Sequence, residues 1–354
     1  MGHNSKSEFG ILKSIWLQDS AGKWSMHGMQ GIDLKPRQDY DPSYFKIDSD
    51  LKMLSGRPGP LTSNMFASFG TTEFLISQSI VPVVSWVEGD PVIRCIGTGF
   101  FVSASGLLIT AAHVIRDPID EKYATATRVD HNTHRLSDNL AFGILLPVNP
   151  ALKNNPFFQL PMEVADTKCF LCPFEWTQHW GKEKESPLFN REPEFDLDVD
   201  IAICKVRQHP LVGPFQPLII GQHRLKVGDQ AVAVGYAEMQ DLQLGAYEHP
   251  ELVVSVGTVT AVHPDNITTK HNSTPGPNFE FSAKIPGRMS GSPILVGSGI
   301  VTKGVVSRSW QDENHASGCL VAAAMDLPIV GNKTLLQLQQ EGNDGIAKIS
   351  GSDL

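Results

Sequence analysis

Short apolar runs separated by turn residues dominate the chain from about residue 75 onward. Runs of this length that are rich in Val, Ile, Thr and Phe predict β-strands. Because no helical pattern alternates with them, they indicate barrels or a sandwich and not a parallel α/β sheet. The clearest runs are found at 77–115, 140–148, 200–206, 229–237, 251–262, 278–285, 292–296, 299–310 and 318–326.

The pattern divides the chain into three parts. Residues 1–74 lack sustained periodicity and are predicted to be an N-terminal extension. Residues 75–330 form the predicted β domain, in which the polar, aromatic and Pro-rich stretch at about 148–196 is interpreted as a surface insertion. In 331–354, a helix with Leu335, Leu336 and Leu338 is expected, with Asn332 as a candidate cap and Gly342 as a stop.

Composition excludes several classes of protein. With 354 residues and 41% hydrophobic content the chain can bury a large core, and its net charge of −9 without a basic cluster argues against a nucleic-acid binder. Neither a signal peptide nor an apolar run of membrane-spanning length is seen, so we expect no membrane partner. The odd number of five cysteines does not suggest a disulfide framework, and the expected location is cytoplasmic.

Three local contexts supply residues for nucleophilic catalysis. His113 follows a pair of β-runs in GTGFFVSASGLLITAAHVI, Asp200 opens the run DIAICKV, and Ser290 lies in PGRMSGSPIL. A serine hydroxyl attacks a carbonyl once an imidazole takes its proton, and the imidazole needs a carboxylate to fix its tautomer. The purely structural alternatives are that His113 is a buried core histidine and that Ser290 is an ordinary turn serine.

The sequence around these residues resembles the chymotrypsin-like serine proteases, in the bacterial branch that includes the Deg/HtrA proteases. The resemblance rests on Gly97–Phe100 with Thr110–His113, on Asp200–Ile203 and on Ser290–Pro293, in that order, with supporting strands between them. It covers roughly residues 75–330. Only about 30 residues follow, so we expect no PDZ module.

The resemblance implies an all-β fold of two six-stranded antiparallel barrels, with the active site between them. It makes His113 the general base, Asp200 the acid that orients it and Ser290 the nucleophile, so the expected partner is a protein or peptide substrate. Asp198 competes with Asp200 because both could face the same side of a strand. The oligomeric state and physiological substrate are not indicated.

One position departs from the family pattern. The oxyanion hole of the family uses the backbone N–H of the serine and of the residue two before it, which is usually Gly. Here that residue is Arg288, and the glycine is displaced to Gly287. Either the N–H groups of Arg288 and Ser290 still form the hole, or the protein is a weak or inactive protease-fold scaffold that binds a peptide or protein partner.

Pocket and metal candidates complete the sequence picture. The family places the floor of its primary pocket near Lys284, which would favour an acidic or polar substrate side chain unless Lys284 is simply a surface lysine. Val306 and Ser307 lie in a segment resembling the strand along that pocket. No cofactor is expected. Cys169 and Cys172 form a single Cys-x-x-Cys pair without a second pair, so we treat them as loop residues, with a metal-dependent hydrolase as the remaining alternative.

Overall fold

The protein is described here from a computed structural model. The structure describes residues 78–116, 140–147, 169–184, 194–207, 215–222, 225–237, 252–265, 273–296, 301–310 and 314–340, and the backbone of residues 11–18, 24–33, 52–55, 126–128, 134–136, 242–243 and 349–350. Within these residues no helix is long and apolar enough to cross a membrane.

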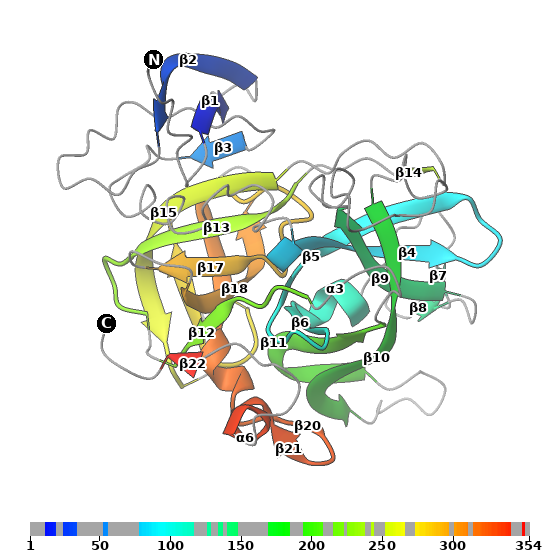
Figure 1. Cartoon of the computed structure of the whole chain (residues 1–354). Helices are drawn as coiled ribbons and strands as arrows, with labels where there is room; N and C mark the ends of the chain where they lie inside the picture. The colour runs from blue at the N-terminus through cyan, green and yellow to red at the C-terminus, as the bar shows by residue number, and fades with distance from the viewer. Residues whose placement is uncertain are drawn as a thin grey trace.

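The first half of the described chain forms a closed antiparallel barrel of six strands (Figure 1). The strands follow the circular order β5-β4-β9-β10-β11-β6, and β6 pairs with β5 to close the ring. Apolar side chains of these strands fill the interior of the barrel, as the apolar runs in the sequence predict. The strands are β4 (Ile80–Val87), β5 (Val92–Phe101), β6 (Leu107–Thr110), β9 (Leu140–Pro147), β10 (Cys169–Lys184) and β11 (Glu194–Val206).

A second closed antiparallel barrel of six strands lies beside the first (Figure 1). Its order is β13-β17-β18-β19-β16-β15, and β15 pairs with β13 to close it. The two barrels confirm the all-β double-barrel fold expected from the sequence. The strands are β13 (Gln230–Tyr236), β15 (Leu252–His263), β16 (Asn278–Phe281), β17 (Pro293–Val296), β18 (Val301–Trp310) and β19 (His315–Leu320).

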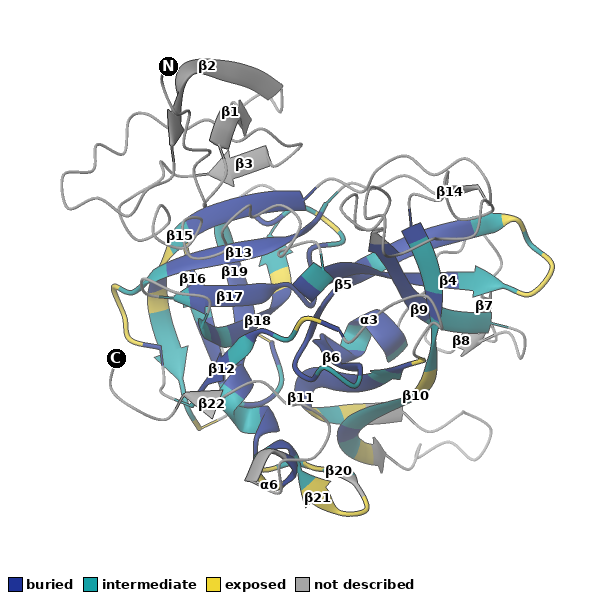
Figure 2. Ribbon diagram, viewed as in Figure 1, coloured by how far each residue is buried: buried dark blue, intermediate teal, exposed yellow. Residues whose placement is uncertain are grey.

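An apolar layer joins the two barrels. Phe100 and Ile201 of the first barrel and Val232 and Val254 of the second belong to one buried cluster. Figure 2 shows that most residues of β13 and β17 and the middle of β18, all strands of the second barrel, are buried. Burying side chains of this size stabilises a fold by about 1.5–3 kcal/mol each, so the layer holds the facing strand ends in a fixed relation.

Short elements surround the barrels. β3 pairs with the second barrel along β15, and β1 and β2 continue that sheet outward, within the N-terminal extension for which the sequence showed no periodicity. The rest of the predicted N-terminal extension, residues 1–74, lies outside the described residues. The short elements are β1 (Ile11–Gln18), β2 (Trp24–Asp33), β3 (Lys52–Ser55), α3 (Ala112–Arg116), β7 (Ala126–Arg128), β8 (His134–Leu136), β12 (Ile219–Gly221), β14 (Leu242–Gln243), η2 (Val321–Ala324), β20 (Pro328–Val330), β21 (Lys333–Thr334), α6 (Leu335–Gln340) and β22 (Ile349–Ser350).

The expected surface insertion at 148–196 requires a correction. Within that stretch, β10 is an integral barrel strand that pairs with β9 on one side and β11 on the other. The sequence of β10 does not alternate regularly between apolar and polar residues. Its pairing with β11 contains two register shifts, and Pro173 interrupts its apolar run. Residues 148–168 and 185–193 lie outside the described residues.

The expected C-terminal helix is present as α6, but a different residue caps it. Thr334 accepts a hydrogen bond at Oγ1 from the Gln337 N–H (3.2 Å), and the Gln337 side chain accepts one from the Thr334 N–H (3.0 Å). This reciprocal pair is a capping box. Asn332 instead has a φ of 62° next to Gly331 at 58°, in the two-residue turn that joins β20 to β21.

Candidate active site

His113 lies in the short helix α3, directly after β6 ends. Ala111 and Ala112 before it are fully buried, and the Thr110 hydroxyl donates to the Thr98 carbonyl at 2.7 Å. These contacts fix the turn that carries the histidine. The His113 side chain is 28% exposed, so its ring is accessible to a bound molecule.

Asp200 meets His113 from β11 and is the acid that the structure brings to it. Its carboxylate accepts hydrogen bonds from His113 Nδ1 at 2.7 Å and from the His113 backbone N–H at 2.9 Å. Val199, Asp200 and Ile201 are all buried, so strict alternation stops here and Asp198 stays exposed. The geometry therefore decides between the two candidate acids in favour of Asp200.

The environment of Asp200 favours its ionised form. Burial raises the pKa of the carboxyl, but the hydrogen bond and charge of His113 and the Ser307 hydroxyl outweigh that effect and hold the pKa below its usual value. A carboxylate only accepts hydrogen bonds, so His113 Nδ1 must be the donor. This leaves Nε2 of a neutral imidazole free to accept a proton.

The depressed pKa of Asp200 predicts a pH-dependent contribution to stability. Asp200 should stabilise the fold above its unfolded-state pKa of about 3.9, and this contribution should be lost as pH falls through its lower folded-state pKa. The difference in unfolding free energy between wild type and Asp200→Asn should therefore shrink as the pH falls below about 5 and through the lower folded-state pKa. Urea unfolding at a series of pH values measures it, and a constant difference would contradict the assignment.

Ser290 sits in a loop of the second barrel that is anchored to the first. Its carbonyl accepts a hydrogen bond from the Thr98 N–H at 2.8 Å, and the following Gly291 N–H donates to the Val306 carbonyl at 2.8 Å. Gly291 has a φ of 87°, and a Cβ there would overlap the Thr98 carbonyl and the Thr110 hydroxyl. The glycine is therefore required for the serine to lie against the strands that carry His113.

Ser307 connects the two halves of the site, a role that the sequence did not reveal. Its hydroxyl donates to Asp200 Oδ2, while its carbonyl accepts a hydrogen bond from Ser290 Oγ at 3.0 Å. The pairing of β18 with β19 shifts between Val306 and Arg308, which places Ser307 at a bulge. Bulges re-aim side chains, and this one turns the hydroxyl toward Asp200.

Replacing Ser307 with Ala should lower kcat and leave KM nearly unchanged. The Asp200 carboxylate loses one donor, whereas the Ser307 carbonyl beside Ser290 remains. Hydrogen bonds to charged groups contribute about 1.5–3 kcal/mol, so we expect kcat to fall about tenfold to 100-fold. Steady-state kinetics on a peptide substrate measures both constants, and an unchanged kcat would refute a positioning role for this hydroxyl.

The hydroxyl of Ser290 forms its hydrogen bond with Ser307 and not with His113 among the described residues. Among the hydrogen bonds of the described residues, Ser290 Oγ donates to Ser307 and none joins it to the His113 ring. The structure thus brings His113 and Asp200 into direct contact and links Ser290 to them through Ser307.

Arg288 adopts the backbone conformation that the family reserves for glycine. Its φ is 73°, whereas Gly287 is exposed, has no left-handed φ, and would have open space around a Cβ. The Arg288 carbonyl accepts a hydrogen bond from Thr98 Oγ1 at 3.2 Å. In the part of the chain that the structure describes, the backbone N–H groups of Arg288 and Ser290 have no protein acceptor. Both are available to an oxyanion.

The three predicted pocket residues have different environments. Val306 is fully buried in the core of the second barrel, and the Ser307 hydroxyl is occupied by Asp200. Their place along a substrate pocket therefore stays a prediction. Lys284 is half-buried and its carbonyl accepts a hydrogen bond from Ser255 Oγ at 2.6 Å, so its place in a pocket stays a prediction.

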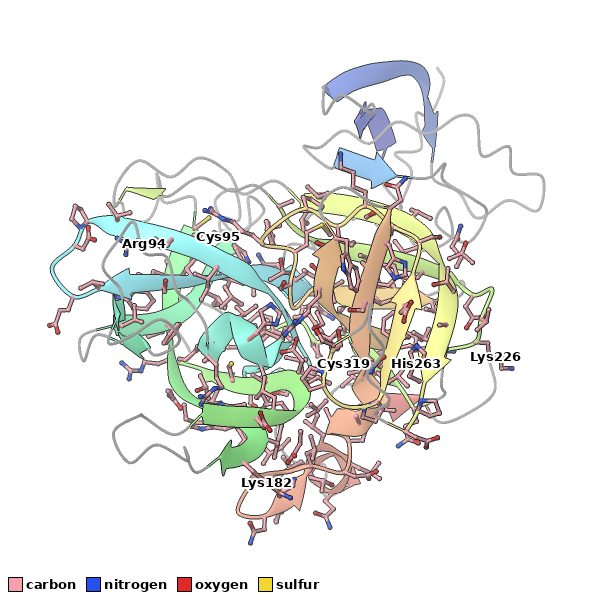
Figure 3. All side chains as sticks on the ribbon, turned by 180° about the vertical axis from the view of Figure 1, so that it is seen from behind. Arg94, Cys95, Lys182, Lys226, His263 and Cys319 are labelled. Carbon is pink, nitrogen blue, oxygen red and sulfur yellow. The ribbon has the colours of Figure 1, made fainter. Side chains whose placement is uncertain are left out.

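All five cysteines are buried free thiols. Burial raises the pKa of Cys172 to about 12, which disfavours the thiolate that metal binding requires. Among the described residues no group of three His, Cys, Asp or Glu side chains could hold a metal ion. Cys319, seen near the centre of the molecule in Figure 3, donates to the Pro275 carbonyl at 3.1 Å, and the Asp200 N–H donates to the same oxygen at 3.3 Å.

Comparison with known proteins agrees with this architecture. The family profile described as trypsin-like peptidase domain matches residues 97–302, more than half of the 354-residue chain. A search of curated proteins finds no match. His113, Asp200 and Ser290 all lie within the matched residues.

Two solved structures show weak overall similarity. Deg5 is 17% identical with a TM-score of 0.40 over 70% of this chain and 87% of Deg5. The active form of the Rv3671c protease from M. tuberculosis is 16% identical with a TM-score of 0.37 over 78% of this chain and 85% of that protease. The family match and the closed barrels, and not these two likenesses, establish the fold. The chain belongs to the trypsin-like peptidase family.

Proposed function

We propose that this protein is a serine endopeptidase that cleaves peptide bonds through Ser290, His113 and Asp200. The observation that carries the proposal is the double hydrogen bond from His113 to the buried Asp200 carboxylate. Ser307 links that pair to Ser290. A buried acid, an oriented imidazole and an adjacent serine are what acyl transfer requires.

The proposed reaction begins with a change in the Ser290 side chain. Rotation about χ1 takes Oγ from the Ser307 carbonyl to His113 Nε2, which accepts its proton as Oγ attacks the substrate carbonyl carbon. The tetrahedral intermediate collapses as His113 returns that proton to the leaving amine, and an acyl-enzyme ester remains on Ser290. Water, deprotonated by His113, then hydrolyses the ester and restores the serine.

The backbone N–H groups of Arg288 and Ser290 hold the oxyanion in this proposal. Neither has a protein acceptor in the described part of the chain, and the left-handed φ of Arg288 supplies the peptide orientation that glycine gives in the family. Each such donor contributes about 10²–10³-fold to kcat in related chemistry. The substitution of Arg for Gly therefore leaves the donors in place.

A second candidate is a protease-fold scaffold that binds a peptide without cleaving it. The hydrogen bond of Ser290 Oγ to the Ser307 carbonyl favours it, because in the described structure the hydroxyl does not form a hydrogen bond with its proposed base. The two candidates differ in one respect only: whether Ser290 reaches His113 when a substrate is bound.

Incubating wild type and Ser290→Ala with an unfolded protein substrate separates the candidates. The protease predicts new peptide N-termini with wild type alone, detected by mass spectrometry and unaffected by EDTA. A scaffold would bind the substrate with both proteins and generate no new termini. Equal cleavage by the two proteins would place the nucleophile elsewhere, and EDTA sensitivity would favour a metal-dependent hydrolase.

A further inference from the structure

The side chain of Arg288 begins from a fixed and strained backbone. A non-glycine residue in the left-handed region costs about 1–2 kcal/mol, and Arg288 has a φ of 73°. Its carbonyl is held by Thr98 and the carbonyl of Ser290 by the Thr98 N–H. The side chain of Arg288 therefore leaves the backbone two residues before the proposed nucleophile, at a position that Thr98 of β5 holds in place.

The guanidinium of Arg288 has an unsatisfied donor. Its Nη1 is buried and makes no hydrogen bond with any described residue, and Arg288 forms no ion pair with any of them. A guanidinium carries five N–H donors and keeps its charge at all physiological pH values. An enclosed donor on a charged group is costly unless an acceptor reaches it. This environment is suited to an acceptor brought by a bound molecule.

The segment around Ser290 is basic in an otherwise acidic chain. Residues 281–310 contain Lys284, Arg288, Lys303 and Arg308 and no Asp or Glu, although the chain as a whole carries a net charge of −9. Lys303 lies against β12, where it would contact a Cβ on Gly221. Arg308 is exposed and its Nη1 donates to Ser273 Oγ at 2.8 Å. Of these four cations, Arg288 is the one that lies two residues from Ser290, so a negative group held over Ser290 would lie closest in sequence to its charge.

Two described carboxylates beside this segment, Asp200 and Glu280, are already engaged. Asp200 is bound by His113 and Ser307. Glu280 of β16 accepts hydrogen bonds from His263 at 3.1 Å and contacts His315 at 3.2 Å. Neither forms an ion pair with Arg288 in the described structure, so both leave this guanidinium open to a carboxylate on the substrate.

We propose that the side chain of Arg288 selects peptide substrates that carry an aspartate or glutamate close to the scissile bond. The inference rests on the proposed function, because a substrate held over Ser290 is what places its side chains beside Arg288. A carboxylate can accept two parallel hydrogen bonds from the planar guanidinium and also carries the opposite charge. An amide of the same size has only one acceptor oxygen and no charge.

Matched peptide pairs test the proposal. Each pair differs only in Glu or Gln at one of three positions on either side of the scissile bond, with the C-terminus amidated to remove its carboxylate. Because hydrogen bonds to charged groups are the stronger class, wild type should cleave the Glu peptide about tenfold to 100-fold more efficiently at one position or more. In Arg288→Gln that ratio of kcat/KM values should fall to about one.

A charge-matched control accompanies the variant. Lys226→Gln removes one positive charge from an exposed side chain that Figure 3 shows at the outer edge of the second barrel, and it should keep the wild-type Glu/Gln ratio. Arg288→Lys should retain part of the preference because it keeps the charge and loses the planar fork. Using a ratio within each protein cancels any effect of the substitution on the oxyanion donors.

Two results would overturn the proposal: a wild-type ratio near one at every position, or a ratio that Arg288→Gln leaves intact. A separate binding experiment distinguishes failure of this proposal from failure of the proposed protease function. If wild type cleaves none of the peptides, fluorescence anisotropy with full-length Ser290→Ala compares binding of the Glu and Gln peptides, with and without Arg288→Gln. Equal binding of the two peptides would reject the role of Arg288, whereas a Glu preference that depends on Arg288 would support it without catalysis.

Discussion

Replacing Asp200 with Asn should reduce kcat about 10⁴-fold while the protein stays folded. An Asn side chain fits the same space but can present an N–H₂ group to His113 Nδ1, which then becomes an acceptor and leaves the proton on Nε2. That tautomer cannot take a proton from Ser290. Steady-state hydrolysis of a peptide substrate measures the loss.

Asp198→Asn provides the matched control for this prediction. Asp198 lies two residues upstream on β11 and is exposed, whereas the Asp200 side chain is only 2% exposed. The control should retain wild-type kcat within about twofold, since exposed side chains away from a site have small effects. Equal losses in the two variants would show that charge on β11, and not contact with His113, governs activity.

Removing His113 or Ser290 should have effects that do not add. His113→Ala and Ser290→Ala are each expected to lower kcat by about 10⁴–10⁶-fold, and the double variant should be no slower than either one. The reason is that the imidazole and the hydroxyl act in one step, so losing either removes the same transition-state interaction. A double variant whose loss equals the product of the two single losses would indicate independent roles.

The sequence predicted the parts of the site that follow from local strand and turn patterns. The context of His113 contains a pair of strands, a glycine turn and two small buried residues, and the structure forms β5, β6 and α3 from it. Asp200 stood directly before an apolar run, and the structure buries it beneath His113. Local patterns suffice here because each residue is fixed by its own strand end.

Features that depend on contacts between distant strands were not predictable. The two hydrogen bonds of Ser307 depend on a bulge between Val306 and Arg308, and the residue types in that stretch do not indicate a bulge. β10 was misread as an insertion because its pairing with β9 and β11 overrides an interrupted apolar pattern. In both cases tertiary pairing determined the backbone.

At Arg288 the departure from the family pattern is visible in the sequence, but its backbone conformation is not. The shifted glycine was visible, but only the structure shows that the left-handed φ falls on Arg288 and not on Gly287. Local propensity opposes this choice, because glycine adopts that conformation without strain. Thr98 donates hydrogen bonds to the carbonyls of Arg288 and Ser290, and this anchoring keeps the arginine there.

The most direct test of the central claim is covalent labelling of the folded protein with a fluorophosphonate. An activated serine displaces fluoride and forms a phosphonate ester, whereas an ordinary turn serine does not react at a comparable rate. We predict a single adduct on wild type by intact mass spectrometry, mapped to Ser290 by peptide sequencing and absent from Ser290→Ala and His113→Ala. Folded wild-type protein that remains unlabelled, or an adduct that persists in Ser290→Ala, would contradict the assignment of Ser290 as the nucleophile.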